Sequence, residues 1–428
     1  MAFVNAGGSF RGNIARVATS SFVSQAILIA ATPLLTRLYA PEEFGSLAIF
    51  SALHAILAVI LTCKYDLAII LPKDNESAFD LAVLPVALAL TLSAAALILF
   101  GAAHMAFDIT MPNYLLLLPV SITLAAAYSS LQQWEARRRA YGPYATAQIL
   151  GSLGNISIVL LLSTLTGAAL GRLVLGFVAG IAFSVIYLPF AIGERSFLRE
   201  RLKRTVSLAA LVAVAREYRQ FPRYVLPLTL LTMLGQNLPP LVLKAMFSLE
   251  QVGYYAIAAR CLLVPSSILG GAIGEPFRSE YVAKLKAGED VAQFMRRTLL
   301  LILAIALPAF AVLIAVAPEA LSFFLGNNYR HSGELVRYMG IGIFAQFVAA
   351  PFQYVFVATG HMRSALVANV AIGVLPLAGM ALAGRVLGLE GALFVAAVIT
   401  FVLSAMLIVM AYRASRAAVR NSPREAKP

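Results

Sequence analysis

Long apolar runs, separated by short polar segments, make up most of the sequence. A transmembrane helix needs about 20 predominantly apolar residues, and about twelve of these runs approach that length. The pattern therefore predicts an all-α integral membrane protein with about twelve transmembrane helices. The predicted spans are residues 17–36, 44–70, 80–103, 113–132, 144–165, 172–192, 223–247, 252–275, 298–318, 335–358, 365–384 and 391–412.

A short polar turn recurs after about half of the chain. Glu42-Glu-Phe-Gly45 is matched by Glu250-Gln-Val-Gly253, an offset of 208 residues in a chain of 428. We therefore expect two pseudo-symmetric lobes of six helices each. The predicted parts are an N-terminal lobe at 1–192, a basic amphipathic cytoplasmic linker at 193–222, a C-terminal lobe at 223–412 and a disordered cytoplasmic tail at 413–428.

Composition agrees with a chain buried in lipid. Hydrophobic residues make up 61% and charged residues 12% of the sequence, whereas soluble domains average about 45–50% and about 25%. Cys63 and Cys261 both lie in predicted spans, where cysteine behaves as a small apolar residue. The net charge of +13 would suit nucleic acid, but its distribution follows a membrane topology. We therefore expect no nucleic-acid partner.

The basic residues lie mostly on one side of the predicted membrane. Of the 33 Lys and Arg residues, 25 fall in the termini and the loops on their side, 5 in the opposite loops and 3 within spans. Such an excess marks the cytoplasmic side, so both termini are expected there. In the largest loop, Leu198, Leu202 and Val206 recur at helical spacing among basic residues. This pattern is typical of a helix on an anionic leaflet and equally of a solvated linker helix.

Motifs for catalysis are missing from the sequence. It contains no phosphate-binding Gly-x4-Gly-Lys-Ser/Thr loop and no serine or cysteine in a nucleophile elbow. The four histidines, His54, His104, His331 and His361, have no metal-ligand spacing. We therefore expect no enzymatic activity, no cofactor and no bound metal.

Polar side chains inside the spans are the remaining candidates, because ionisable groups in a membrane are costly and are often functional. The first half carries His54, Lys64 and Asp66, and the second carries Gln236, Asn237, Lys244, Arg260 and Glu275. Arg260 is the strongest of these. It lies eight residues into its predicted span, about 12 Å along the helix, which is farther than a snorkelling arginine reaches.

The other candidates have simpler explanations as well. Lys64 and Asp66 can form an interfacial ion pair without a role in transport. His54 can be an ordinary buried histidine or a proton carrier. Arg37 and Lys244 close the first helix of each half, where snorkelling explains them. Glu275 can cap its span or pair with a nearby cation as a charge partner.

Cations outnumber anions in and beside these spans. The cations are Arg37, Lys64, Lys244 and Arg260, and the anions are Asp66 and Glu275. A cavity with this balance suits an anionic substrate. Phosphate is the natural candidate, because guanidinium and ammonium groups bind it through charge-assisted hydrogen bonds.

Prolines lie at comparable places in the two halves. The first span carries Pro33, and its counterpart carries Pro239 and Pro240. A proline removes a backbone hydrogen bond and kinks a helix, and paired broken helices mark the binding region of many transporters. We therefore predict hinges at these positions. Proline is also common in membrane helices, so a purely structural role stays open.

Several segments resemble the Wzx-type polysaccharide flippases of the multidrug/oligosaccharidyl-lipid/polysaccharide exporter superfamily. In the first half these are Arg37-Leu-Tyr-Ala-Pro-Glu-Glu-Phe-Gly45 and Lys64-Tyr-Asp-Leu-Ala-Ile-Ile-Leu-Pro72. The second half adds Tyr218-Arg-Gln-Phe-Pro222, Gln236-Asn-Leu-Pro239, Val252-Gly-Tyr-Tyr255, Arg260, Pro265, Phe324-Leu-Gly326, Pro351 and Gly360-His-Met-Arg363. The order and spacing of these segments carry the resemblance. Lys64-Tyr-Asp departs from the Arg-Tyr-Glu that is more usual in the family, although the signs of the charges are kept.

The resemblance implies a flippase of the bacterial inner membrane with two six-helix lobes. It would carry undecaprenyl-pyrophosphate-linked oligosaccharide, as in O-antigen or lipopolysaccharide synthesis, from the cytoplasmic to the periplasmic leaflet by alternating access. Its partners would be this lipid-linked oligosaccharide, membrane lipid and other polysaccharide assembly proteins. A drug/cation antiporter of the same superfamily and a membrane glycan polymerase or ligase are the alternatives. The antiporter needs an acidic cavity, and the polymerase needs catalytic carboxylates or a sizeable outer loop.

The charge asymmetry gives a first testable topology. Single cysteines placed at Arg138 and Lys203 should react with reagents applied to the cytoplasmic side. Cysteines at Glu42 and Asn327 should react from the periplasmic side, because both lie in predicted loops with few basic residues. Impermeant maleimide labelling of intact cells measures both sets, and labelling of Glu42→Cys from the cytoplasm alone would overturn the topology.

Overall fold

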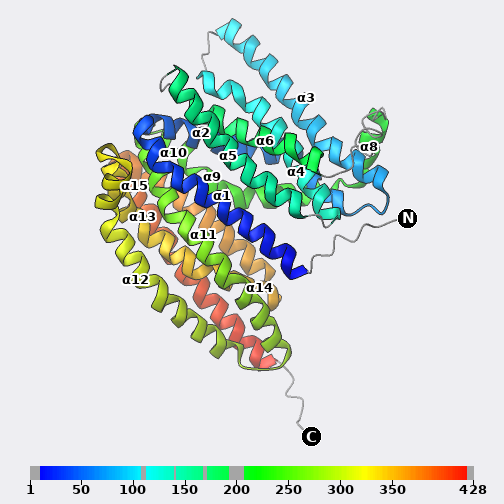
Figure 1. Ribbon diagram of the computed structural model, residues 1–428. Coiled ribbons are helices and arrows are strands. Elements are labelled where there is room, and N and C mark those ends of the chain that lie inside the picture. The colour runs from blue at the N-terminus through cyan, green and yellow to red at the C-terminus, as the bar shows by residue number, and fades with distance from the viewer. Residues whose placement is uncertain (1–9, 108–111, 139–140, 167–170, 192–206, 422–428) are drawn as a thin grey trace. The chain divides into compact units, whose positions relative to one another are not determined.

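The structure is a computed structural model of the chain and describes residues 10–107, 112–138, 141–166, 171–191 and 207–421 (Figure 1). Every regular element within these ranges is helical, which confirms the predicted all-α fold. The chain divides into two compact units, Met1–Leu230 and Leu231–Pro428. Each unit is described by itself.

The first unit contains long helices and two short interruptions. Its elements are α1 (Phe10–Leu38), α2 (Pro41–Thr62), the 3-10 helix η1 (Tyr65–Ile70), α3 (Asn75–Phe107), the 3-10 helix η2 (Asn113–Leu117), α4 (Leu118–Arg138), α5 (Tyr141–Thr166), α6 (Arg172–Ala191), α8 (Leu208–Glu217) and the π-helical turn η3 (Phe221–Val225). Helix α9 (Leu226–Asn237) crosses from this unit into the second.

The second unit continues from α9 and ends in a long helix. Its further elements are α10 (Pro239–Lys244), α11 (Leu249–Lys286), α12 (Val291–Leu325), η4 (Asn327–Tyr329), α13 (Arg330–Ala349), η5 (Ala350–Phe352), α14 (Gln353–Ala358) and α15 (Met362–Asn421). Gly388 has φ 71° and separates two arms of α15, which match the last two predicted spans. Helix α15 runs to Asn421, so the predicted disorder of the tail from residue 413 is wrong for this part of it.

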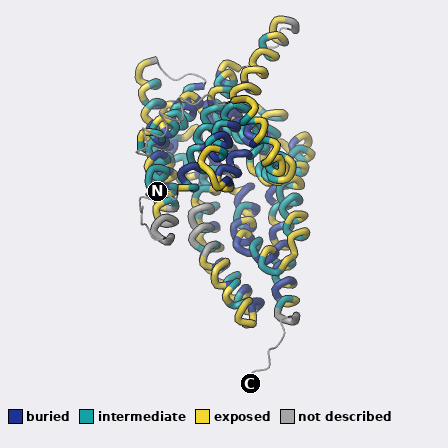
Figure 2. Tube along the Cα trace, turned by 90° about the vertical axis from the view of Figure 1, so that its right-hand side faces the viewer, coloured by how far each residue is buried: buried dark blue, intermediate teal, exposed yellow. Residues whose placement is uncertain are grey.

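Nine helical segments within the described ranges are long and apolar enough to cross a membrane. They cover the predicted spans one to six and nine to twelve, with the last two joined in α15. Predicted span seven is divided between α9 and α10, and predicted span eight is the first part of α11. Exposed residues occur along the length of many helices (Figure 2), and they include large apolar side chains such as Ile98, Leu99 and Leu382. Apolar side chains exposed in this way suit contact with lipid.

The predicted single helix at 44–70 is wrong. Helix α2 ends at Thr62, and the chain turns through Cys63 and Lys64, with φ 50° and 55°, before η1 begins at Tyr65. Left-handed backbone at residues other than glycine costs about 1–2 kcal/mol per residue. Because this turn contains neither glycine nor proline, an apolar run read from the sequence gives no sign of it.

The closest helix packing in the first unit joins α5 and α6. A Cβ atom added to Gly180 would lie 2.6 Å from the backbone oxygen of Gly151 and 3.0 Å from Cβ of Asn155. Small residues allow membrane helices to approach to such distances, where van der Waals contact holds them together. The two glycines therefore fix the distance between these helices.

Replacing Gly180 with alanine should destabilise the first unit by about 1–3 kcal/mol, because the added methyl group must push α6 away from α5. Thermal unfolding of purified protein in detergent measures the loss. Gly101→Ala in α3 is the matched control, since its Cβ would meet no atom within 4 Å. Equal melting temperatures for the two variants would contradict the packing argument.

Candidate functional site

The break after α2 places a charged pair inside the first unit. Nζ of Lys64 lies 3.4 Å from Oδ2 of Asp66, and the two side chains are only 17% and 3% exposed. Ser129, on α4, donates a second hydrogen bond to Oδ2 at 2.5 Å. Oδ1 of Asp66 is buried and has no hydrogen-bond partner within the described part of the chain. The structure therefore brings Lys64 and Asp66 together as a pair held by α4.

Arg137, near the end of α4, covers the other end of the break. Its Nη1 donates to the carbonyl oxygens of Ile69 at 3.2 Å, Ile70 at 3.4 Å and Pro72 at 2.5 Å. Its Nη2 donates to the carbonyl oxygen of Asp74 at 3.2 Å. The last carbonyls of a helix have no partner within it and need one from elsewhere. Arg137 supplies that partner for η1 and for the loop that follows.

Sequence reasoning did not single out Arg137 or Ser129. Arg137 counted only as one of three adjacent loop arginines, and Ser129 lies in a run of small residues. Both contact residues more than sixty positions away. No local pattern in the sequence reports such pairings, so only the fold reveals them.

His54 lies within α2, farther from the break. No described contact joins it to Lys64 or to Asp66. Its Nδ1 is 3.0 Å from Oγ of Ser121, which itself donates to the carbonyl of Leu118 at 2.8 Å. With its hydroxyl proton used in this way, Ser121 accepts a hydrogen bond from Nδ1–H of the imidazole. Phe50 and Phe177 flank the ring at centroid distances of 6.3 and 5.1 Å.

The first helix of each unit carries its prolines differently. Helix α1 continues through Pro33 to Leu38, and Arg37 is exposed in its last turn. Pro239 and Pro240 instead open α10, after α9 has ended at Asn237. One helix therefore gives way to the next at Pro239 and Pro240, with the backbone of Leu238 between the two helices still right-handed helical, whereas α1 is continuous through Pro33.

The polar residues around the α9–α10 interruption are partly satisfied by their own helix. Nδ2 of Asn237 donates to the carbonyl oxygen of Met233 at 3.0 Å. Gln236 is exposed, as is Lys244 in the last turn of α10. Gly235 packs α9 against α15, because a Cβ added to it would lie 2.6 Å from Cα of Gly373. The end of α9 is thus fixed immediately before the interruption.

Arg260 lies on α11, a continuous helix, and is partly buried. Its neighbours Ala259 and Leu262 are buried. Within the described part of the chain, no hydrogen bond or ion pair reaches its guanidinium. Glu275, whose side chain lies outside the described residues, follows fifteen positions later on the same helix, about 22 Å away at the α-helical rise. Glu275 is therefore too distant to neutralise Arg260.

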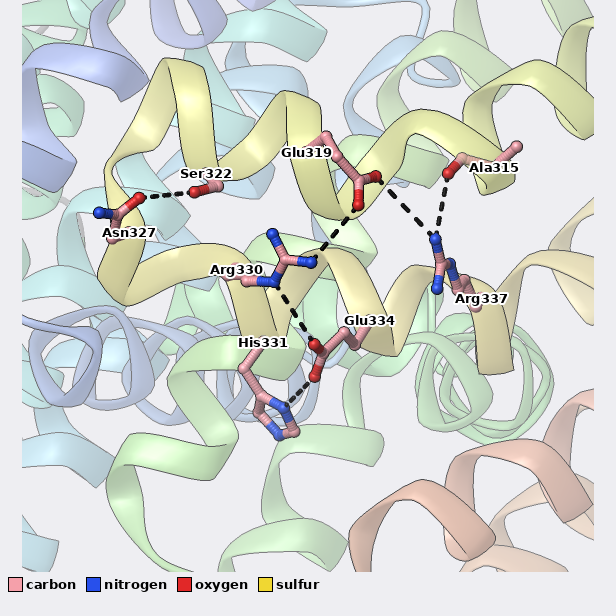
Figure 3. A network of polar contacts seen from close by, with 8 residues as sticks. All are labelled: Ala315, Glu319, Ser322, Asn327, Arg330, His331, Glu334 and Arg337. Atoms are coloured by element: carbon pink, nitrogen blue, oxygen red, sulfur yellow. Dashed lines mark hydrogen bonds and ion pairs between the residues drawn. The ribbon is translucent and has the colours of Figure 1, made fainter.

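A polar network at the junction of α12 and α13 was also not predicted (Figure 3). Glu319 on α12 lies 3.5 Å from Arg330 and 3.9 Å from Arg337, both on α13. Glu334 lies 3.9 Å from Arg330 and 3.1 Å from His331. The sequence did carry one sign of it: Arg330 and His331 precede Glu334 by four and three residues, a spacing at which side chains on a helix can pair.

This network fastens one helix to the next. Arg337 also donates to the carbonyl oxygen of Ala315 at 3.2 Å, and Ser322 donates to Asn327 at 2.8 Å across the turn. The carboxylates and guanidinium groups are 42–58% exposed, and exposed ion pairs contribute about 0–1 kcal/mol each. The network therefore has the properties of exposed ion pairs that hold two helices together, and not those of a buried binding site.

Comparison with known proteins identifies a family by sequence. Residues 34–334 match the sequence profile of a family described as "Polysaccharide biosynthesis protein". No curated protein matches the chain significantly.

Solved structures share the fold. An inward-facing multidrug resistance MATE family transporter of the MOP superfamily is 13% identical, with a TM-score of 0.69 and coverage of 98% of both chains. The lipid II flippase MurJ, in an inward closed conformation, is 12% identical, with a TM-score of 0.69 over 94% of this chain and 90% of that one. A MOP superfamily transporter from Pyrococcus furiosus is 14% identical, with a TM-score of 0.59 and 96% coverage of both. The predicted resemblance is thus confirmed at the level of family and fold.

The Arg137 cap predicts a large effect of one side chain. Arg137→Ala should lower the stability of the protein by about 1–3 kcal/mol, because the carbonyls of η1 lose their donors. The stability of Arg137→Lys should lie between that of the wild type and that of Arg137→Ala, since an ammonium group has fewer donors than a guanidinium and lacks its planar fork. Thermal unfolding in detergent gives the ranking, with Arg416→Ala at the exposed end of α15 as the control. Arg137→Ala as stable as Arg416→Ala would show that the cap is dispensable.

Proposed function

The chain belongs to the polysaccharide biosynthesis protein family, and from this premise we propose that it is a flippase for a lipid-linked oligosaccharide. Its substrate would be an undecaprenyl-pyrophosphate-linked oligosaccharide, carried from the cytoplasmic to the periplasmic leaflet of the bacterial inner membrane, with both termini cytoplasmic. The product would enter the synthesis of a surface polysaccharide such as O-antigen in lipopolysaccharide, and other assembly proteins would take it up.

One observation carries the proposal. Arg260 presents a guanidinium from a continuous helix, among buried apolar neighbours, with no anionic partner in the described part of the chain. An isolated charge in a membrane protein is costly, so a charge that is retained there is a candidate functional residue. A planar guanidinium binds phosphate oxygens through two parallel hydrogen bonds. The pyrophosphate of a lipid-linked sugar supplies the missing anion.

The remaining parts of such a substrate need no charged site. Its polyprenyl tail is as apolar as lipid and would stay in the bilayer while the pyrophosphate binds Arg260. The exposed Lys244 and Gln236 beside the α9–α10 interruption would contribute further donors. Alternating access would then carry the headgroup between leaflets, as inferred for transporters built from repeated halves.

A drug/cation antiporter is the second candidate, and the fold favours it equally. The MATE transporter shares this architecture at 13% identity, which is evidence of fold alone. A cationic substrate needs an uncompensated carboxylate in its site. In the first unit the buried carboxylate of Asp66 has Lys64 beside it, and Glu43, Asp80 and Glu135 are buried as well. In the second unit the isolated charge is the cation Arg260. Arg260 therefore supports an anionic substrate, whereas the buried carboxylates of the first unit are the feature that would suit a cation.

Surface glycan in cells that lack the endogenous protein provides the test. Arg260→Ala should abolish export of the polymer because charge and fork are both lost, and Arg260→Lys should keep partial export because the charge remains. Glycan is normalised to the amount of protein in the membrane. Arg385→Ala, at an exposed position of α15, is the control and should export normally.

Two results would decide against this assignment. Normal surface glycan with Arg260→Ala would show that the phosphate binds at other residues, and Lys64 and Lys244 would be the next to replace. Failure of the lipid-linked oligosaccharide to accumulate in cells that lack the protein would reject the substrate class itself. Both variants should reach the membrane in normal amounts, because Arg260 has no described partner whose charge its removal would strand.

A further inference from the structure

Helix α8 is apolar on every side. Its first eight residues are alanine, valine or leucine, and only Arg216 and Glu217 at its end are polar. A surface helix of a soluble protein carries one apolar stripe, whereas a helix that is apolar all round is covered by protein or by lipid. At ten residues it is about 15 Å long, too short to cross a bilayer. What covers each side of α8 therefore needs an explanation.

One side of α8 is covered by the first unit. Val214 is buried in a cluster with Tyr65, Ile69 and Trp134, and Leu211 packs against that cluster. The hydroxyl of Tyr65 donates to the carbonyl oxygen of Ala215 at 3.1 Å. Figure 1 shows α8, in green, beside the N-terminal end of α3. These contacts fix α8 to η1, to α3 and, through Trp134, to α4.

No described residue covers the other side of α8. Leu208 is 77% exposed and Val212 41% exposed, and Ala209 and Ala213, which follow them, are also exposed. Residues four apart lie on the same face of a helix, so Leu208, Val212 and Arg216 share one face of α8. Apolar side chains and an arginine therefore share the exposed face.

Positive charge concentrates where this face ends. Arg216 is followed by Arg219 and Arg223, all exposed, with Glu217 the one carboxylate among them. Anionic lipids attract such segments by about 1 kcal/mol for each basic residue near the surface. The charge thus matches an acidic leaflet rather than an acidic water-soluble ligand, because the arginines adjoin an apolar face.

We propose that the exposed face of α8, Leu208 to Arg216 with Arg219, lies on the membrane and binds anionic phospholipid headgroups. Lipid is favoured over a protein partner because α8 lies directly beside the start of α3, a candidate membrane span, so the exposed face adjoins a surface that already faces lipid. Leu208 and Val212 would enter the boundary between headgroups and acyl chains, and the arginines would meet the phosphates.

Depth in the membrane is the first test. The full chain, with Cys63→Ser and Cys261→Ser, receives a single cysteine at Val212 or at Glu217 and an environment-sensitive fluorophore, and is placed in nanodiscs. Glu217 points about 140° away from Val212 around the helix. Brominated phosphatidylcholine should quench the probe at position 212 severalfold more than at position 217. Equal, weak quenching at both positions would overturn the proposal, as expected for a face covered by water or by another protein.

Headgroup preference is the second test. Adding phosphatidylglycerol to phosphatidylcholine nanodiscs should raise the melting temperature of the unlabelled wild-type protein. The variant Arg216→Gln/Arg219→Gln should lose more than half of this increase, whereas Arg385→Gln should keep all of it. An unchanged increase in the double variant would exclude α8 as the headgroup site. Because neither measurement involves transport or Arg260, failure here leaves the flippase assignment untouched.

Discussion

Backbone groups inside a membrane protein must find partners within the protein, and the break after α2 shows how this chain meets that requirement. Two left-handed residues, Cys63 and Lys64, cost about 1–2 kcal/mol each, and the carbonyls of η1 lose their helical partners. Arg137 supplies donors to those carbonyls. Tyr65 and Ile69 enter the core that holds α8. The break therefore places Asp66 against α4 and η1 against α8, and Arg137 caps its far end.

Asp66 in the first unit and Arg260 in the second differ in how their charges are compensated. In the first, Asp66 is compensated by Lys64 and Ser129, so the pair holds the break without offering a free charge to a substrate. In the second, Arg260 is left without a described anionic partner. A compensated pair stabilises a structure at most modestly, whereas an uncompensated charge in a membrane protein is a candidate binding residue. Lys64, Asp66 and Arg260 were all candidates in the sequence, and the fold distinguishes the paired residues from the one without a described partner.

Periodic features were predictable and pairings between distant segments were not. Nine of the predicted spans coincide with long apolar helices, and a tenth does so as far as Thr62, because apolar runs of this length leave few alternatives. The break at Cys63 was missed because neither glycine nor proline marks it. The partners of Asp66 and of η1, Ser129 and Arg137, lie more than sixty residues away. Arg260 was singled out from the sequence because a deep arginine is informative by itself, whereas its lack of a partner among the described residues needed the fold.

The placement of the interruptions relative to Arg260 bears on how a flippase of this kind would move. The backbone turns sharply after α2, and two prolines separate α9 from α10, whereas α11 runs unbroken through Arg260 from a capped start at Ser248. Hinges absorb changes in φ and ψ at a few residues at the ends of elements. A guanidinium on an unbroken helix keeps its geometry while such ends move. Binding and movement would therefore be assigned to different helices, so that the phosphate contact persists as access changes from one leaflet to the other.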